Sequence, residues 1–211
     1  AHALVAPLVP IEWSEDDDDF GGFSGLVVTD GGKVLWAASD TGTLWRAEVE
    51  RGTDGRIAAI RANWHDRFRD NKGKKVSGFT EDAEALAPRP DGGFFVAYES
   101  YARITGLHPP DMKPEALHDF DRFKPYWDNA SFEGLARLPD GRLLAVVETR
   151  DDAAGGYPTF LGKDGVWQSG PTLRTAPDFG ASDATVDAEG RLWLLERRLT
   201  WLAEFEVRVS T

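Results

Sequence analysis

This chain contains no cysteine, one methionine and no long apolar run. The absence of cysteine excludes disulfides, iron–sulfur clusters, thiolate zinc sites and a cysteine nucleophile. No stretch reaches the ~18 consecutive apolar residues of a membrane-spanning helix, so we expect no membrane insertion. Positive charge is also scarce, because 24 Lys and Arg stand against 36 Asp and Glu, a net charge of −12. This balance argues against nucleic-acid partners and favours cations.

Turn-forming residues and aromatic rings are abundant. The 211 residues include 22 Gly, 12 Pro, 8 Trp and 12 Phe. Pro and Gly interrupt the sequence before a helix of useful length could form. A turn-rich chain with many aromatic and β-branched residues is typical of an all-β protein. The length is sufficient for one sizeable core, and no linker divides the chain.

One pattern occurs four times, at a spacing of about 50 residues. Each copy has an apolar run, a turn with Asp or Glu beside Gly, and a second apolar run, which together indicate a β-hairpin. Repeats of this length predict an all-β β-propeller with about four blades visible in this chain. The four copies begin at Phe23, Asp82, Ser131 and Ser182.

The domain organisation follows from these repeats. We expect an N-terminal arm with an acidic loop over residues 1–22, then a single β-propeller domain over residues 23–211. Residues 61–81 are polar and are expected to form a loop. A propeller leaves few free edges only when its ring closes. Two arrangements stay open: a four-bladed ring closed by the arm, or part of a five- or six-bladed propeller completed by a missing C-terminal segment or an oligomer partner.

Acidic residues occupy the same two places in the copies. They stand at the start of the first strand or at the end of the second, at Glu84, Glu133 and Asp183 and at Asp40, Glu99, Glu148 and Glu196. These two points lie side by side in a hairpin, and in a propeller they would converge on one rim of the central channel. Several carboxylates suit a hard cation such as calcium, so all seven are candidate metal ligands. Alternatively, each acid pairs with Arg103, Arg197 or Arg198, or caps a strand-end amide.

Familiar nucleophile and zinc motifs are missing from the sequence. Gly22-Phe23-Ser24-Gly25 lacks the Gly-x-Ser-x-Gly spacing of a nucleophile elbow, and a strand is expected to follow where the elbow has a helix. The four His show no His-x-x-x-His spacing. A serine nucleophile and a metalloprotease-type zinc site are therefore not supported.

Several segments resemble the phytase-like family, known as "esterase-like activity of phytase". They are Phe20–Leu26, Ser39–Gly42, Asp82–Ala87, Phe132–Ala136 and Leu194–Arg198. The resemblance spans residues 13–209, and it implies a β-propeller, an exported location (periplasmic or secreted) and calcium-dependent phosphoester chemistry. Members of the family are usually longer than this chain. The start, Ala1-His2-Ala3-Leu4, is typical of a signal-peptide cleavage remnant or a tag scar.

The expected function is calcium-assisted hydrolysis of a small anionic substrate, a phosphate ester, at the acid-lined channel rim. Glu84 and Glu133 would be the catalytic carboxylates, and Arg103 and Arg197 would hold the phosphate oxygens. The alternative is a non-catalytic propeller module that binds a small ligand or a protein partner, because a propeller scaffold does not decide between the two.

Overall fold

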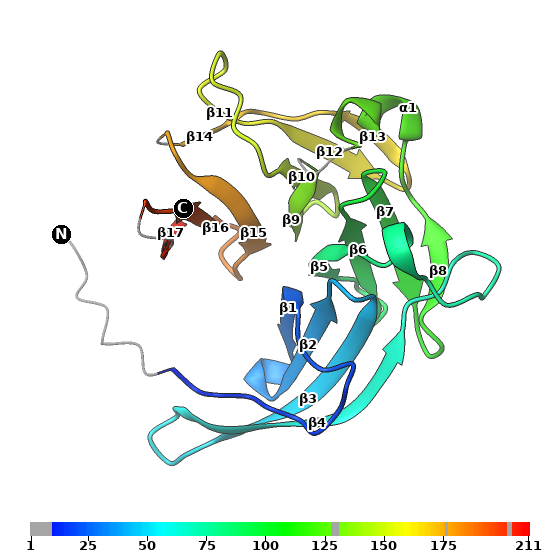
Figure 1. The fold of residues 1–211 in the computed structure, drawn as a ribbon, viewed down its shortest axis with the longest axis vertical. Helices are drawn as coiled ribbons and strands as arrows, with labels where there is room; N and C mark the ends of the chain where they lie inside the picture. The colour runs from blue at the N-terminus through cyan, green and yellow to red at the C-terminus, as the bar shows by residue number, and fades with distance from the viewer. Residues whose placement is uncertain (1–9, 128–130, 176, 202–203) are drawn as a thin grey trace.

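Antiparallel sheets stand side by side around a central channel, and each of the four larger sheets is one blade of a β-propeller (Figure 1). The structure is a computed structural model that describes residues 10–127, 131–175, 177–201 and 204–211, and within these it has four blades. The expected cleavage remnant at residues 1–4 lies outside the described residues. The predicted all-β propeller is confirmed.

The blades follow one another along the chain. Blade 1 comprises β1 (Phe23–Thr29), β2 (Val34–Ser39), β3 (Thr43–Arg51) and β4 (Ile57–Arg67). Blade 2 comprises β5 (Ala83–Pro88), β6 (Phe94–Tyr98), β7 (Arg103–His108) and β8 (Lys113–Ala116). Blade 3 comprises β9 (Phe132–Arg137), β10 (Leu143–Val147), β12 (Thr159–Lys163) and β13 (Val166–Ser169). Blade 4 comprises β15 (Gly180–Val186), β16 (Leu192–Leu199) and β17 (Phe205–Ser210).

The remaining elements are short. A small sheet joins β11 (Gly156–Tyr157) to β14 (Leu173–Arg174). The helical turns are α1 (Phe120–Phe123) and the 3-10 turns η1 (Asp30–Gly32), η2 (Gly78–Thr80) and η3 (Lys124–Tyr126). In the part of the chain that the structure describes, no helix is long and apolar enough to cross a membrane.

The first hairpin of each blade turns where the sequence predicts. In blades 2, 3 and 4, Gly92, Gly141 and Gly190 have φ angles of 87°, 85° and 81°. Glycine adopts these positive angles without the steric cost that a Cβ would bring. In blade 4, Asp187 Oδ1 also accepts hydrogen bonds from the backbone N–H groups of Glu189 and Arg191. Local turn chemistry therefore sets the hairpins.

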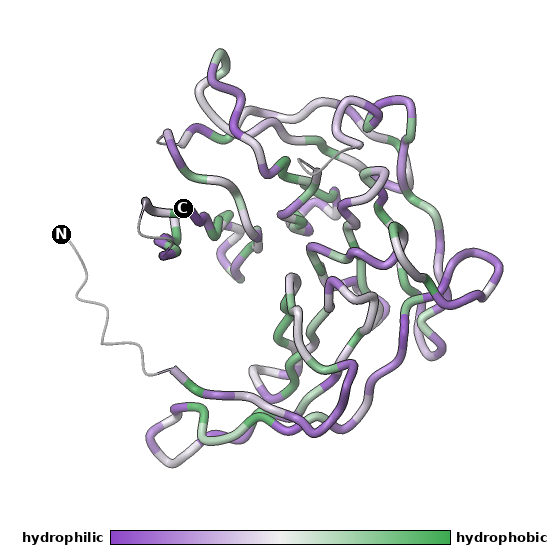
Figure 2. Tube along the Cα trace, viewed as in Figure 1, coloured by the Kyte–Doolittle hydropathy of each residue, from purple (hydrophilic) through white to green (hydrophobic). Residues whose placement is uncertain are grey.

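The core consists of the layers between neighbouring blades. One apolar cluster joins blades 1 and 2, a second joins blades 2 and 3, and a third joins blades 3 and 4. Figure 2 shows that the hydrophobic segments concentrate in the strands, whereas the connecting loops are hydrophilic. Phe132 is fully buried in the second layer, where its ring lies 4.8 Å from that of Phe123 in an edge-on arrangement. Each blade is therefore held by its neighbours.

Small residues let the innermost strands approach one another. A Cβ atom on Gly25 of β1 would lie 2.7 Å from the backbone nitrogen of Leu86 on β5. A Cβ atom on Gly134 of β9 would lie 3.0 Å from the Cβ of Ala184 on β15. These glycines bring the inner ends of adjacent blades together around the channel.

Residues 10–22 of the N-terminal arm lie against blade 1. The Trp13 ring stacks on Phe23 at a centroid distance of 5.0 Å, and Glu15 Oε1 accepts a 2.7 Å hydrogen bond from the backbone N–H of Ala62 on β4. Within the described residues no strand pairs with the outer edge of β17, so these arm residues do not close the ring there. The loop expected over residues 61–81 is wrong at its start, because β4 continues to Arg67 along β3.

Candidate functional site

A β-bulge occurs at the same place in the innermost strand of every blade. The register between the first two strands of each blade shifts by one residue, which leaves Ser24, Glu84, Glu133 and Ser182 without a partner across the ladder. Bulges redirect side chains. All four of these residues line one cavity of about 220 Å³ in the central channel.

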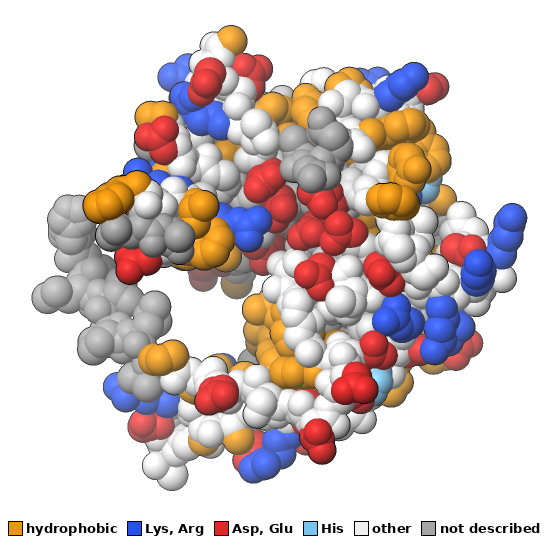
Figure 3. Space-filling model, in the orientation of Figure 1, with side chains coloured by type: hydrophobic (Ala, Val, Ile, Leu, Met, Phe, Trp, Pro, Cys, Tyr) orange, Lys and Arg blue, Asp and Glu red, His pale blue; other side chains and the backbone are white. Residues whose placement is uncertain are grey.

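Both polar and apolar side chains line the cavity. Phe23 of β1, Leu195 of β16 and Val207 of β17 contribute apolar lining, whereas Arg197 of β16 contributes a positive charge. The two glutamates come from blades 2 and 3, and Glu133 lies beside Arg197 of blade 4. Figure 3 shows acidic side chains gathered near the centre of the ring, with basic side chains beside them.

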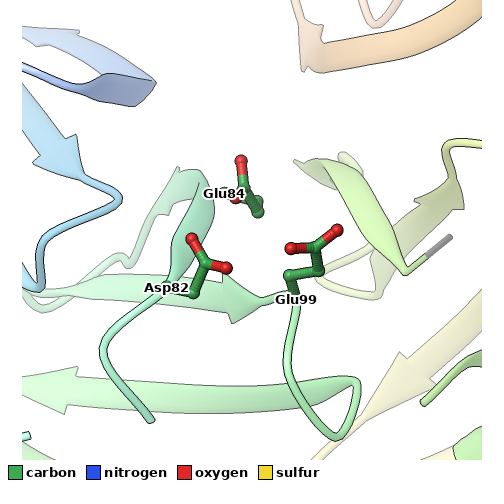
Figure 4. Close-up of side chains that lie close together, drawn as sticks. All are labelled: Asp82, Glu84 and Glu99. Atoms are coloured by element: carbon green, nitrogen blue, oxygen red, sulfur yellow. The ribbon is translucent and has the colours of Figure 1, made fainter. Parts of the chain in front are cut away.

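Three carboxylates of blade 2 form a tight cluster. One oxygen each from Asp82, Glu84 and Glu99 lies within 4.8 Å of the others, and Figure 4 shows the three side chains grouped together. Asp82 precedes β5, Glu84 occupies the bulge, and Glu99 follows β6. The Glu99 backbone N–H donates to the Asp82 carbonyl oxygen at 3.0 Å, which closes the end of the hairpin. The predicted proximity of Glu84 and Glu99 is therefore observed.

Blade 3 repeats this arrangement with one change. The Glu148 backbone N–H donates to the Ser131 carbonyl oxygen at 2.9 Å, the counterpart of the bond from Glu99 to Asp82. Ser131 therefore stands where blade 2 has Asp82. Its side chain is buried, and its hydroxyl has no hydrogen-bond partner among the described residues. The Ser182 hydroxyl in the channel is likewise buried and unpaired within the described part.

One arginine faces the acids from blade 4. Arg197 Nη2 lies 3.9 Å from Glu133 Oε1 and 3.8 Å from Glu148 Oε1. It supplies one positive charge beside the five carboxylates of Asp82, Glu84, Glu99, Glu133 and Glu148. The cluster is therefore left with a negative charge that a bound cation would offset.

The proton affinity of the cluster reflects this crowding. Burial, followed by the charge of Glu133, raises the pKa of Glu84 well above its ordinary value of 4.5. Burial, followed by the charge of Glu148, raises the pKa of Glu133 to about 7, although Arg197 opposes the shift. Like charges in a partly desolvated site disfavour ionisation. Such shifts are common at functional sites.

Asp40 extends the acidic cluster towards blade 1. Burial and the nearby charge of Asp82 raise the pKa of Asp40, although hydrogen bonds from Thr41 and Ser39 oppose this rise. Its backbone N–H donates to the Gly22 carbonyl oxygen at 2.8 Å, so its place in blade 1 matches that of Glu99 in blade 2. Asp40 therefore lies beside the cluster, as the repeat pattern predicts.

The expectation that Glu196 belongs to the cluster is wrong. Glu196 is paired across the ladder with Ala181, before the bulge, whereas Arg197 occupies the place of Glu99 and Glu148. The Glu196 side chain is 1% exposed and accepts hydrogen bonds of 2.6 Å and 2.7 Å from Arg208. A displacement of one residue along a strand moves a side chain to the other face of the sheet.

Asp183 and Arg103 also lie apart from the cluster. Ser182, not Asp183, occupies the bulge, and the Asp183 carboxylate accepts a 2.7 Å hydrogen bond from the backbone N–H of Ala184. Burial raises the pKa of Asp183 to about 7. Arg103 donates to the Thr80 carbonyl oxygen at 2.8 Å and lies 4.4 Å from the centre of the Tyr98 ring. The expected role of Arg103 in holding phosphate therefore does not fit its contacts.

Sequence reasoning missed three polar residues of the site. Asp82 stands two positions before Glu84 at the start of the first strand of the second repeat. Side chains two residues apart in a strand lie on the same face, so this spacing could have identified Asp82. Ser24 and Ser182 carry no charge, and only the bulges identify them as counterparts of Glu84 and Glu133.

The donor set fits a hard divalent cation. Calcium takes six to eight oxygen ligands from carboxylates, carbonyls and water. Asp82, Glu84 and Glu99 offer carboxylate oxygens close enough to share one ion, and Glu133 lies near enough to raise the pKa of Glu84. With no cysteine in the chain, a soft thiolate-bound metal is excluded.

Comparisons with known proteins match most of this chain. The family described as "Esterase-like activity of phytase" (phytase-like) matches residues 18–211. No curated protein matches. Similar solved structures include a gluconolactonase from Xanthomonas campestris, with 16% identity, a TM-score of 0.49, and coverage of 87% of this chain and 56% of that chain. A streptogramin B lyase has 13% identity and a TM-score of 0.48, with coverage of 88% and 54%.

A third similar structure is described as a putative gluconolactonase. It has 20% identity and a TM-score of 0.49, and the match covers 88% of this chain and 62% of that chain. The present chain therefore spans between 54% and 62% of the length of these three structures.

Proposed function

This chain belongs to the phytase-like family, and we propose that it hydrolyses a phosphate ester in the central channel with the help of bound calcium. The observation that carries the proposal is the arrangement of charge around the cavity. A group of partly buried carboxylates from blades 2 and 3 stands beside Arg197 from blade 4. A cation and an arginine are the two groups that recognise phosphate oxygens.

Asp82, Glu84 and Glu99 would hold the cation, with Glu133 at its margin. When bound, calcium would offset the charge of the phosphate group and acidify a water molecule. Arg197, which lies beside Glu133 and Glu148, would donate hydrogen bonds to the phosphate oxygens. Glu133, whose pKa of about 7 lies near neutrality, is suited to accept a proton from water at a carboxylate oxygen. Phe23, Leu195 and Val207 would contact the organic part of the ester.

A second function, binding without hydrolysis, is favoured by the position of Arg103. The Arg103 guanidinium donates to backbone carbonyl oxygens and packs on the Tyr98 ring. Of the two arginines expected to bind phosphate, Arg197 is therefore the one placed to bind an anion. A site with fewer phosphate-binding groups would bind an anionic ligand together with calcium and release it unchanged. We infer an exported location for either function, as the family resemblance implies.

Two measurements on the same preparation test the proposal. Calorimetric titration with calcium is expected to show binding, and the hydrolysis of p-nitrophenyl phosphate is expected to require that calcium. The double variant Glu84→Gln/Glu99→Gln should lose both. The control Glu189→Gln changes an exposed turn residue that pairs with Arg191, and it should retain both.

The outcomes separate the two functions. Calcium binding without turnover of any phosphate ester would favour the binding module over the hydrolase. No calcium binding by the folded wild-type protein would reject both, because each depends on the cation.

A further inference from the structure

A second cavity, of about 540 Å³, lies between blades 2 and 3. The turn between β5 and β6 lines it on one side, and the turn between β9 and β10 lines it on the other. Glu84 and Glu133 lie near the starts of β5 and β9, whereas these turns follow the ends of the same strands. The cavity is therefore at the end of the blades away from the carboxylate cluster, and both blades that form it have four strands.

Part of the cavity wall is apolar and is held in place by contacts between the blades. Phe95, Leu117, Leu143 and Trp167 contribute the apolar lining. The Trp167 indole N–H donates to the Leu117 carbonyl oxygen, a bond that joins β13 of blade 3 to the segment after β8 of blade 2. The Arg89 guanidinium packs 4.8 Å from the centre of the Phe95 ring. A pre-formed, partly apolar cavity of this size suits a small organic molecule.

The charge of Arg89 is already matched by its neighbours. Arg89 donates to Asp91 Oδ1 at 3.1 Å and to Nδ1 of His108 at 3.2 Å, and its side chain is only 14% exposed. Nε2 of His108 donates in turn to Glu115 Oε2 at 2.7 Å. These four residues form a connected polar wall in which no charge remains for a ligand.

Two other cations line the cavity without such partners. The side chains of Arg137 and Lys163 form no ion pair or hydrogen bond within the described residues. Among the acids that line the cavity, Asp140 pairs with Arg142 at 2.7 Å, whereas Asp164 has no cation partner in the described part of the chain. Two positive charges and one negative charge are therefore unpaired, which leaves a surplus of one positive charge at this place in a chain of net charge −12.

Arg137 also departs from the propeller repeat. It is the last residue of β9, and the corresponding last residues of the innermost strands are Thr29 in β1, Pro88 in β5 and Val186 in β15. None of these three carries a charge, so the repeat does not account for an arginine at this position. Arg137 is partly buried, and an arginine without a partner beside a cavity is suited to recognise an anion.

We propose that the cavity between blades 2 and 3 binds a small organic carboxylate, independently of the function of the channel. Arg137 would donate paired hydrogen bonds to the two carboxylate oxygens, and Lys163 would add a second positive charge. The apolar part of the ligand would contact Phe95. A surplus of one positive charge matches a monoanion, whereas a phosphate dianion would keep an unmatched charge beside Asp164.

The first test uses p-fluorobenzoate as the probe and follows its binding by fluorine NMR. The wild-type protein should bind it at millimolar concentration, and the uncharged p-fluorobenzamide should bind roughly tenfold more weakly. Arg137→Gln/Lys163→Gln should lose a similar factor in affinity for the carboxylate. The control Arg56→Gln/Arg191→Gln removes two exposed cations elsewhere, with the same change in net charge, and should bind as wild type does.

The second test is a substitution that should improve binding. Asp164→Asn removes the unpaired negative charge and should tighten p-fluorobenzoate binding by about two- to fivefold, the size of an exposed ion-pair effect. All these variants should melt as wild type does, because Arg137, Lys163 and Asp164 have no partner to lose.

Three results would overturn the proposal: no binding by the wild-type protein, equal binding of the uncharged amide, or unchanged affinity in Arg137→Gln/Lys163→Gln. The variant Arg197→Gln distinguishes this cavity from the channel. Unchanged binding by Arg197→Gln is expected, and a loss of binding would assign the probe to the channel and overturn the proposal as well.

Discussion

Glu196 and Arg197 are consecutive residues of β16 whose side chains point to opposite faces of blade 4. The Glu196 carboxylate is buried against Arg208, whereas the Arg197 guanidinium is half-exposed and lies beside Glu133 and Glu148 at the channel. Successive side chains of a strand alternate between its two faces. Glu196 therefore stabilises the blade, whereas Arg197 contributes to the channel site. Substitutions should separate these two roles.

Replacing Glu196 should destabilise the fold without removing the channel site. Glu196 accepts hydrogen bonds from Arg208, Thr175 and Ser210, and Glu196→Ala would leave these groups without their shared acceptor. Removing one partner of a buried ion pair costs about 3–5 kcal/mol. Urea denaturation should show a loss of about that size. Glu206→Gln removes an exposed ion pair with Arg198 and should have a much smaller effect. A Glu196→Ala protein as stable as wild type would contradict this account.

Replacing Arg197 should change ligand binding more than stability. Arg197→Gln removes the positive charge beside Glu133 and Glu148, so inorganic phosphate should bind more weakly and calcium more tightly. Arg197→Lys keeps the charge and should retain part of the phosphate affinity. Competition by phosphate and calorimetric titration with calcium measure the two effects. Equal phosphate affinity in wild type and Arg197→Gln would remove Arg197 from the site.

Stability in the presence of a chelator should fall as the pH rises from about 4.5 through 7. Glu133 has a pKa of about 7 in the folded protein, above its ordinary value of 4.5, and that of Glu84 is also raised. The folded state therefore holds protons that the unfolded state releases, so the stabilisation is complete below pH 4.5 and is lost as the pH passes the folded pKa. Denaturation at several pH values measures this loss, and Glu84→Gln/Glu133→Gln should flatten it.

Below pH 4.5 the stability should instead fall as the pH decreases, because of Glu196. Burial alone would raise the pKa of Glu196, but hydrogen bonds from Arg208, Thr175, Ser210 and Tyr157 lower it to about 2. The stabilisation from this depressed pKa is present above pH 4.5 and disappears as the pH falls through 2. A Glu196→Gln variant should show a shallower acid transition than wild type.

Calcium should raise the melting temperature, and more strongly at pH 8 than at pH 6. A ligand that binds only the folded state stabilises it by about 2.7 kcal/mol at a hundredfold excess over its dissociation constant. Protons compete for the same carboxylates, so affinity increases with pH. Differential scanning fluorimetry with calcium and with a chelator measures the shift. An unchanged melting curve at millimolar calcium would reject the metal site.

Adding a methyl group at Gly25 should separate blades 1 and 2. The new Cβ would lie 2.7 Å from the backbone nitrogen of Leu86, which is closer than atoms pack. Overpacking typically costs about 1–3 kcal/mol. Chemical denaturation of Gly25→Ala should show a loss in that range, and an unchanged stability would mean that the inner strands move apart freely.

The local parts of the fold could be predicted from the sequence. Hairpins, turns and the propeller repeat depend on alternation and turn residues within a short stretch of chain, and Gly92 and Gly141 occupy the turns that their neighbours predict. The convergence of Glu84, Glu99, Glu133 and Glu148 followed from the same pattern, because the two ends of a hairpin meet away from its turn.

Only the tertiary structure decided which residues of blade 4 face the channel. The bulge in β15 places Ser182 and Arg197 where the repeats suggested Asp183 and Glu196, and a shift of one residue reverses the faces of a strand. The hydrogen bond from Arg103 to the Thr80 carbonyl oxygen likewise depends on a segment that lies well before Arg103 in the sequence. Sequence patterns of period two determine where strands lie, but bulges and long-range packing determine which side chain reaches the site.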